Sequence, residues 1–299
     1  MKRRLVKQAN QAMTVTLPIG WIRENKLKAG DEIDLELCEK NIIIRTENKS
    51  SGGKANFDFQ GFDRRKSITY INSAYANGID ELEVKTELDI YNIISQNIGY
   101  AIVGEHKCKY TIKDLSGGTT TDLRDIFKRV FQMLITFYES ALKDVFYDHK
   151  ADIQIVSSMD REINKYTFFL QRQIMKHAYD NQSVGRIMFA YSFWLEHLGD
   201  LISRLWLVQL TSKFSLNKID ESICALSMKS MHASFQAWYQ FNDEIIDDLI
   251  AGKAEIRKKI MRSGNSNPAK SMFLNYALKI VEDCADLAHL AIMLHIKKE

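Results

Sequence analysis

Proline and glycine, the residues that most often interrupt helices and strands, are scarce in this chain of 299 residues, which holds only 2 Pro and 14 Gly. Average usage would place roughly 12% of a chain in these two residues, about twice what is found here. Only Pro268 follows Thr119, and apolar residues recur with helical spacing over nearly all of that region. The sequence therefore predicts a mainly α-helical protein with long helices.

The region after Thr119 is expected to form a bundle, because its loops are short and short loops favour antiparallel neighbours. The expected helices cover 120–149, 150–179, 183–213, 217–250, 252–262 and 268–297. The length of the chain indicates more than one domain. The expected divisions are an N-terminal β domain at 1–48, a linker at 49–66, a small α+β connector at 67–118 and the helical bundle at 119–299.

Composition narrows the class of protein. With 45% apolar and 26% charged residues the chain is globular, and its 4 Cys are scattered without a Cys-x-x-Cys pair, as expected in a reducing compartment. No apolar run of signal-peptide length follows the N-terminal charges. The most apolar stretch, 189–210, carries Glu196, Asp200 and Arg204, which a bilayer core would penalise. We therefore expect a cytoplasmic protein without membrane insertion.

Positive charge is concentrated at the N-terminal end, although the net charge of the chain is only +3. Residues 1–30 hold seven Lys or Arg residues and one acid, whereas residues 31–49 hold six acids and three bases. A compact basic patch is typical of a nucleic-acid contact, because the neutralisation of phosphates drives affinity. A solvated chain terminus would have the same composition and is the alternative interpretation.

The basic residues are interspersed with short elements. Residues 12–18 alternate and are rich in β-branched side chains, which predicts a strand, and Pro18 opens a short helix over 19–25. Further strands are expected at 33–37 and 41–45, on either side of a tight turn. A domain this small is marginal at burying a core alone, so we expect a second copy to complete it.

This N-terminal segment resembles the AbrB/SpoVT/MazE family of swapped-hairpin DNA-binding domains. The resemblance is carried by Thr14-Val15-Thr16-Leu17-Pro18-Ile19-Gly20-Trp21-Ile22, by Leu27-Lys28-Ala29-Gly30-Asp31-Glu32 and by the strand at 42–45. It implies that two chains interleave into one barrel and that basic residues near the first strand contact DNA. The matching residues are Arg3, Arg4, Lys7, Arg23, Lys26 and Lys28. A small β domain that contacts only protein is the alternative.

The middle of the chain reads as a linker followed by a connector. Lys49-Ser50-Ser51-Gly52-Gly53-Lys54 predicts flexibility over 49–66. The patterns that follow predict helices at 67–77 and 88–97 and strands at 81–85, 100–105 and 107–113. The run Ser116-Gly117-Gly118-Thr119 is either a turn with a helix cap or an anion site at the start of the next helix.

Two acidic motifs recur in the helical region. Glu196-His197-Leu198-Gly199-Asp200 is echoed 86 residues later by Glu282-Asp283-Cys284-Ala285-Asp286, and each motif puts two carboxylates on one helix face. Ala151-Asp152-Ile153 is echoed 103 residues later by Ala254-Glu255-Ile256. We therefore expect two three-helix repeats, about 119–213 and 217–299, with a shorter middle helix in the second.

These motifs resemble the PhoU family of phosphate-transport regulators, whose three-helix repeats carry Glu-x-x-x-Asp motifs. The segment 159–166 also resembles the start of that family's second helix, and an AbrB-type head before a PhoU-like body is similar to archaeal phosphate uptake regulators. The resemblance implies a link to phosphate uptake or phosphate signalling. The chain departs from the family at Asn164-Lys165, where archaeal relatives tend to have Asp-Arg, and at His197 and Asp283, which replace Arg.

Carboxylates one helical turn apart repel each other, and a divalent or trivalent cation would relieve that repulsion. Family members bind metal in this way, so the resemblance makes these acids candidate metal ligands: Glu196, Asp200, Glu282 and Asp286, with Asp160, Asp243 and Asp247 as cross-helix partners. Asn164 removes ligand charge from the first repeat. The alternative is that the pairs lie at the rim of the bundle, solvated or matched by cations such as Arg204 and Lys279.

No catalytic motif accompanies these acids. The sequence has no Walker loop, Gly-x-Ser-x-Gly or Gly-x-Gly-x-x-Gly, and Asp286-Leu287-Ala288-His289 is only a partial match to a di-iron motif. We therefore expect no enzyme but a dimeric DNA-binding transcriptional regulator with a sensing helical body. The main alternative is an adaptor that docks on a transporter or signalling partner and uses its N-terminal domain only to dimerise.

Overall fold

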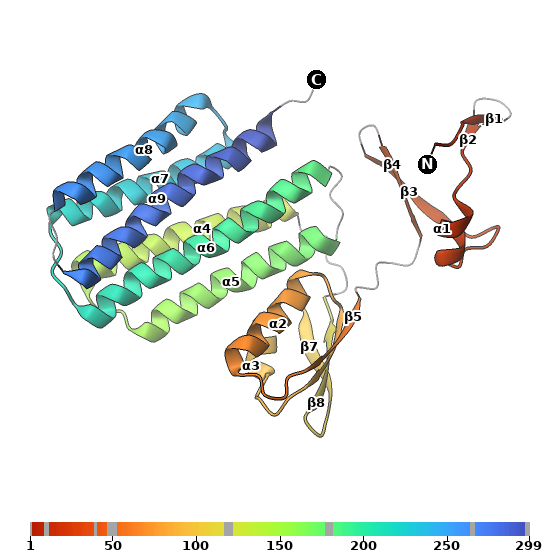
Figure 1. Cartoon of the computed structure of the whole chain (residues 1–299), viewed down its shortest axis with the longest axis horizontal. Coiled ribbons are helices and arrows are strands. Elements are labelled where there is room, and N and C mark those ends of the chain that lie inside the picture. Colours follow the sequence, from red (N-terminus) through yellow and green to blue (C-terminus); the bar gives the residue numbers. More distant parts are fainter. Residues whose placement is uncertain are drawn as a thin grey trace. The chain divides into compact units, whose positions relative to one another are not determined.

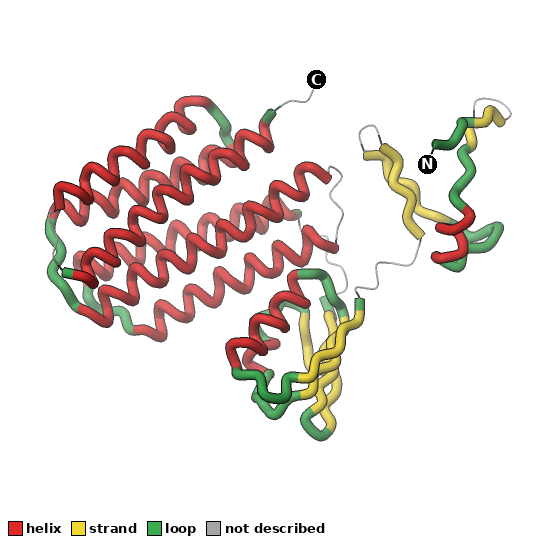
Figure 2. The backbone as a smooth tube through the Cα atoms, viewed as in Figure 1, coloured by secondary structure: helices red, strands yellow, loops and turns green. Residues whose placement is uncertain are grey.

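The structure is a computed structural model that describes residues 2–8, 12–38, 41–46, 53–116, 122–176, 182–263 and 267–296. The chain divides into two compact units, Met1–Ser51 and Gly52–Glu299. Within the described chain, strands occur only as far as residue 114, and every helix of more than 20 residues begins at residue 123 or later (Figure 2). The prediction of a mainly helical protein with a small N-terminal β region is confirmed.

The first unit contains two hairpins and a short helix. The strand β1 (Val6–Gln8) pairs antiparallel with β2 (Ala12–Thr14), and α1 (Ile19–Glu24) follows. The strand β3 (Ile33–Cys38) then pairs antiparallel with β4 (Asn41–Thr46). The helix and the second hairpin lie where the sequence places them. The strand β1 was not expected, because it is short and its residues after Val6 are polar.

A four-stranded sheet opens the second unit, with the strand order β5-β6-β8-β7. The strand β5 (Lys54–Asp58) runs parallel to β6 (Glu81–Lys85). The strand β8 (Lys109–Asp114) lies antiparallel between β6 and β7 (Tyr100–His106), and the pairing with β7 is irregular between Ile102 and Gly104. The edges of this sheet are therefore β5 and β7.

The helices of this region are α2 (Arg64–Ala76), between β5 and β6, and the short α3 (Tyr91–Ile94). Apolar side chains of α2, α3 and the sheet, such as Ile71, Leu82 and Ile112, form a buried core. The expected connector is thus an α+β fold, but the helix expected over 88–97 is only the short α3.

The expected linker at 49–66 is wrong from Lys54 onward. Ala55 and Phe57 are half-buried and alternate with exposed residues, which is the pattern of a strand with one face covered. The helix α2 also begins before the end of that segment, since the Asp63 side chain accepts a hydrogen bond from the Lys66 amide at 2.7 Å and caps it. The prediction went too far because the Ser-Gly-Gly run just before β5 is typical of a linker.

Of the run at 116–119, the structure describes only Ser116. The predicted anion site therefore lies outside the described residues. Ser116 itself donates its hydroxyl to Asp114 Oδ1 at 2.6 Å.

The helical bundle has helices α4 (Leu123–Lys143), α5 (Ile153–Lys176), α6 (Gln182–Ser212), α7 (Lys218–Tyr239), α8 (Asp243–Ser263) and α9 (Pro268–His295). A short π-helical turn, Asp144–Asp148, extends α4. The helices α4, α5 and α6 pack on one another, and so do α7, α8 and α9 (Figure 1). Contacts of α6 with α9 and of α4 with α7 join the two groups.

The expected end of a helix at 250 and the expected start of the next at 252 are both wrong. The chain breaks between α7 and α8 at 240–242 rather than before Gly252. Gly252 lies inside α8, where an added Cβ would come within 3.3 Å of Ser230 Oγ, so this glycine allows close packing against α7. The actual break contains neither Pro nor Gly, and Asn242 Oδ1 caps α8 by accepting from the Ile245 amide at 2.8 Å.

The second sequence echo is not a structural repeat. Ala151–Ile153 lies at the start of α5, whereas Ala254–Ile256 lies in the middle of α8. The middle helix of the second group is shorter, as expected, but only slightly, with 21 residues in α8 against 24 in α5.

Within the described chain, no helix combines the length and the apolar character needed to span a bilayer.

Candidate functional site

Among the residues of the first unit whose burial the structure describes, none is buried. Leu35 and Leu37 alternate along β3 on one face, and their exposed fractions are 64% and 80%. Other large apolar side chains are also exposed: Leu5, Val6, Met13, Val15, Ile19 and Ile42. Each Å² of apolar surface left in water forgoes about 25 cal/mol of stabilisation. As a single chain, this unit has strands and a helix but no core among the residues whose burial is described.

The residues expected to contact DNA are all exposed in this unit. Arg3 and Arg4 precede β1, Lys7 lies within it, and Arg23 lies in the last turn of α1. Lys26 and Lys28 follow α1, and Lys26 has a positive φ of 56°. Among the described residues, no ion pair neutralises any of these side chains. The basic residues are therefore available to an anionic partner.

Two residues of the motif at 27–32, Gly30 and Asp31, stabilise the turn after α1. Gly30 has a φ of 98°, a conformation that favours glycine. Asp31 Oδ2 accepts a hydrogen bond from the Lys28 amide at 2.7 Å. The Gly-Asp pair is thus explained by the turn itself.

Three of the expected metal ligands lie together between α5 and α6, and we call Asp160, Glu196 and Asp200 the first acidic cluster. Asp160 is half-buried, and its Oδ1 is a buried atom without a hydrogen-bond partner. Asn164 Nδ2 donates to Asp160 Oδ2 at 3.5 Å, and Asn164 Oδ1 is also buried without a partner. Arg204 pairs with Asp200 on the same helix.

The raised pKa values of two carboxyls indicate that this cluster has too little positive charge nearby. Burial, together with the charges of Asp200 and Asp160, raises the pKa of Glu196 to about 7, against the opposing charge of Arg204. Burial also raises the pKa of Asp160 to about 6, together with repulsion from Asp200, against the opposing charge of Arg204. The cluster therefore holds its full negative charge with difficulty near neutral pH.

The second acidic pair, Glu282 and Asp286 on α9, has a different environment. Arg257 on α8 contacts Glu282 Oε1 at 2.5 Å, and Lys253 on α8 pairs with Asp286. Lys279 also lies 3.6 Å from Glu282 Oε2. Side chains of the chain itself therefore supply the positive charge that a metal would supply.

Two of the residues that differ from the expected pattern, His197 and Asp283, meet across the α6–α9 interface. His197 Nε2 lies 3.3 Å from Asp283 Oδ2, and Asp283 is buried. Lys279 lies 3.3 Å from the other oxygen of Asp283. Lys279 supplies positive charge to this carboxylate, but burial still raises the pKa of Asp283, and Asp283 Oδ2 is a buried atom without a hydrogen-bond partner.

The remaining expected ligands are not brought to either site. Asp243 and Asp247 are exposed on α8, and no hydrogen bond or ion pair joins them to Glu282 or Asp286 within the described residues. In that part of the chain, no three His, Cys, Asp or Glu side chains form a group ready to hold a metal. At the first acidic cluster, a metal would need Asp200 to turn away from Arg204.

The sequence interpretation missed a buried ion network at the junction of the sheet and the bundle. Arg172 on α5 has a side chain only 1% exposed. It donates to the carbonyl oxygens of Tyr75 and Ile79 at 2.9 and 2.7 Å, pairs with Asp80, and contacts Asp114 Oδ2 at 2.7 Å. Lys176, one turn later, contacts Asp80 at 2.6 Å. The α+β connector is therefore fastened to the helix that carries Asp160.

Hydrogen bonds at this junction shift one carboxyl strongly. Burial by itself would raise the pKa of Asp114, but hydrogen bonds from Ser116 and Arg172 outweigh it and lower that pKa to about 2. No periodicity or motif marks Arg172, since its partners lie more than 50 residues away in the sequence.

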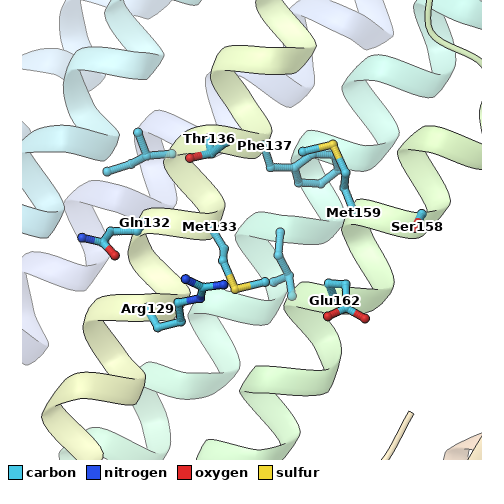
Figure 3. A pocket seen from close by; sticks show the side chains of 10 residues that line it. Arg129, Gln132, Met133, Thr136, Phe137, Ser158, Met159 and Glu162 are labelled. Atoms are coloured by element: carbon cyan, nitrogen blue, oxygen red, sulfur yellow. The ribbon is translucent and has the colours of Figure 1, made fainter. Parts of the chain in front are cut away.

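A groove of about 630 Å³ opens between α4 and α5 on another face of α5. Figure 3 shows Met133, Phe137 and Met159 along it, with Arg129 and Glu162 among the polar side chains that line it. The first acidic cluster does not line this groove. An apolar groove with two methionines suits the apolar face of another helix.

Comparison with known protein families, curated proteins and solved structures finds no match to this chain.

Proposed function

We propose that this protein is a dimeric DNA-binding transcriptional regulator, linked to phosphate uptake or phosphate signalling, with a helical body that senses the signal. The observation that carries the proposal is the first unit, which exposes both its apolar side chains and its basic side chains. A second copy would cover the former, and DNA phosphates would neutralise the latter.

Interleaving supplies the missing core. Leu35, Leu37 and Ile42 belong to one hairpin and are exposed in a single chain. If two hairpins pack face to face, these side chains leave water in both copies, which stabilises the dimer by about 25 cal/mol for each Å² buried. The arrangement is the swapped-hairpin barrel that the family resemblance implies.

DNA contact follows from the duplication of the basic residues. A dimer presents Arg3, Arg4, Lys7 and Arg23 twice, related by a two-fold axis that matches the symmetry of a palindromic DNA site. Lys26 and Lys28 would add phosphate contacts at the edge. The head would then gain most of its affinity from released counterions.

The body would sense a cation at the first acidic cluster. Three carboxylates from two helices, one with an unpartnered buried oxygen, suit a hard divalent or trivalent cation. Asp160, Glu196 and Asp200 would be the ligands, with the Asn164 amide oxygen beside them. The second acidic pair would not bind metal, because Arg257 and Lys253 already neutralise it. Each chain would therefore bind one cation.

The experiment is binding of mixed genomic DNA fragments over a series of salt concentrations. Wild type is compared with Arg3→Ala/Arg4→Ala and with the matched control Arg64→Ala/Arg65→Ala, an adjacent arginine pair that is exposed on α2. We expect a log–log salt slope of about −0.9 per phosphate neutralised. Only the first variant should lose affinity and slope. Equal binding by all three proteins would contradict the proposal.

The alternative is an adaptor that does not bind DNA and whose body docks on a transporter or signalling partner. The groove between α4 and α5 favours it, since Met133 and Met159 offer an adaptable apolar surface (Figure 3). Absence of DNA binding by the intact dimer at low salt would support this alternative.

A further inference from the structure

We propose that the edge strand β5 is an interface with a second copy of this chain, in which two β5 strands pair antiparallel about Asn56. The two sheets would then join into one continuous sheet across a two-fold axis.

The backbone of β5 offers a regular hydrogen-bonding edge. The carbonyl of Gly53 accepts from the Asp80 amide at 3.0 Å, and the Phe59 amide donates to the Lys85 carbonyl at 2.9 Å, so both face β6. Hydrogen-bonding direction alternates along a strand. Lys54, Asn56 and Asp58 therefore turn their amides and carbonyls outward, away from β6. No other described strand lies beyond them.

The sequence of β5 is complementary to itself in antiparallel register. With Asn56 opposite Asn56 of the second copy, Lys54 lies opposite Asp58, and Asp58 lies opposite Lys54. Both side chains are about half exposed in the single chain, at 53% and 54%. Opposite charges directly across a strand pair stabilise it, whereas like charges destabilise it. The register that pairs all the outward backbone groups is thus also the register that pairs the charges.

The helix-facing side of β5 provides an apolar place for the second copy. A groove of about 480 Å³ lies there, lined by residues that include Ala55, Phe57 and Tyr70. Tyr70 is 43% exposed and lies edge-on to Phe57, with ring centroids 5.8 Å apart. In the proposed register Phe57 of the second copy lies opposite Ala55, on this same face. Its ring would fill the groove beside Tyr70.

The other edge of the sheet is not equivalent. The pairing of β7 with β8 is shifted between Ile102 and Gly104, and such irregularities protect an edge from pairing with another chain. No opposite charges would face each other if β7 paired with itself about Val103. Of the two edge strands of this sheet, only β5 brings opposite charges together in self-pairing.

Chain connectivity favours the pairing of two β5 strands. This step rests on the dimer of the first unit that is proposed above. β4 ends at Thr46 and β5 begins at Lys54, so the chain between them spans at most roughly 28 Å at about 3.5 Å per residue. Two first units that have interleaved would hold two β5 strands at high effective concentration. A short strand pair that is weak alone would then form.

The test is disulfide formation in the full-length protein, in a Cys38→Ser/Cys108→Ser background. Asn56→Cys would place two cysteines opposite each other, with Cα atoms about 5.5 Å apart, within the range of a disulfide. The matched variant Asp58→Cys would place its two cysteines about 14 Å apart along the strands. We expect Asn56→Cys to cross-link about a hundredfold faster, since only this position brings the two cysteines within the range of a disulfide.

A charge exchange tests the register. Lys54→Asp should slow cross-linking at position 56 by about two- to fivefold, and adding Asp58→Lys should restore the rate. The exchange does not restore the contacts of Lys54 with Glu81 or of Asp58 with Lys85 within one chain, so recovery reports on the second copy.

The outcomes separate this inference from the proposed function. Equal, slow cross-linking of Asn56→Cys and Asp58→Cys in a protein that sediments as a dimer would overturn the β5 interface and leave the first-unit dimer standing. Fast cross-linking of Asn56→Cys that persists when Leu35→Asp is added would support β5 pairing even if the first unit does not dimerise.

Discussion

Leu35 in the first unit and Leu115 in the second are equally exposed, each at 64%, but they belong to regions with very different interiors. Around Leu115, the second unit buries Leu82, Ile112 and many other apolar side chains, so one exposed leucine is ordinary. Around Leu35, none of the first-unit residues whose burial is described is buried. The exposure of one side chain therefore carries little information until the interior beneath it is known.

The largest expected effect distinguishes these two leucines. Leu35→Asp should weaken dimerisation by about 3 kcal/mol in each copy, or roughly ten-thousand-fold in the dissociation constant, because the side chain is buried only in the dimer. Leu115→Asp should leave the dissociation constant unchanged. Sedimentation velocity over a concentration series measures both, and equal effects of the two substitutions would show that the first unit gains no core from a second copy.

The next effect concerns the buried junction of the second unit. Arg172→Ala should lower the free energy of unfolding by about 3–5 kcal/mol, since it leaves Asp114 buried and weakens the attachment of the connector. Lys85→Ala removes an ion pair with Asp58 in which both side chains are about half exposed, and should cost much less. Urea unfolding compares the two. A cost at Arg172 as small as that at Lys85 would mean that the network does not hold the connector.

Acid should also weaken the second unit through Asp114. Because the pKa of this carboxyl is lowered to about 2 in the folded state, its contribution is present above its ordinary pKa near 3.8 and is lost as the pH falls through 2. We expect a loss of about 2 kcal/mol over this range. The free energy of unfolding, measured against pH, should fall less steeply for Asp114→Asn than for wild type. Parallel curves would exclude Asp114 as the source.

The smallest effect tests the asymmetry between the acidic sites of the bundle. Mn²⁺ at about ten times its dissociation constant should stabilise the wild type by about 1.4 kcal/mol. Asp160→Asn/Glu196→Gln should abolish this gain, whereas Glu282→Gln should retain it, because Arg257 already neutralises Glu282. Thermal unfolding with and without the ion measures the shift. A gain lost only in Glu282→Gln would place the cation at the second pair.

Local patterns explain how far the sequence alone could predict this structure. The helix at 19–24, the strand at 81–85 and most helices of the bundle follow from spacing that is visible within one segment. The break at 240–242 contains no Pro or Gly and depends on capping by Asn242, so it was hidden within a continuous helical pattern. The break expected between 250 and 252 instead lies inside α8, where Gly252 allows close packing against Ser230 of another helix.

The candidate sites also differ in whether spacing within one segment predicts them. The pairing of Glu196 with Asp200 and the approach of Asp160 follow from helical spacing and the expected bundle. The neutralisation of Glu282 and Asp286 by Arg257 and Lys253 depends on the register between α8 and α9, which no spacing within one helix reveals. Arg172 could not be found at all, because its partners come from distant segments that meet only in the folded chain.

Hydrogen exchange of the full-length protein at two concentrations tests the central contrast most directly. The amides of β3 and β4 in the first unit should be protected at high concentration and should lose that protection on roughly hundredfold dilution, since their core exists only in the dimer. The amides of β6 and α3 in the second unit should exchange at the same rate in both samples. Protection of β3 and β4 that does not change with concentration would show that the first unit is stable alone and would contradict the account.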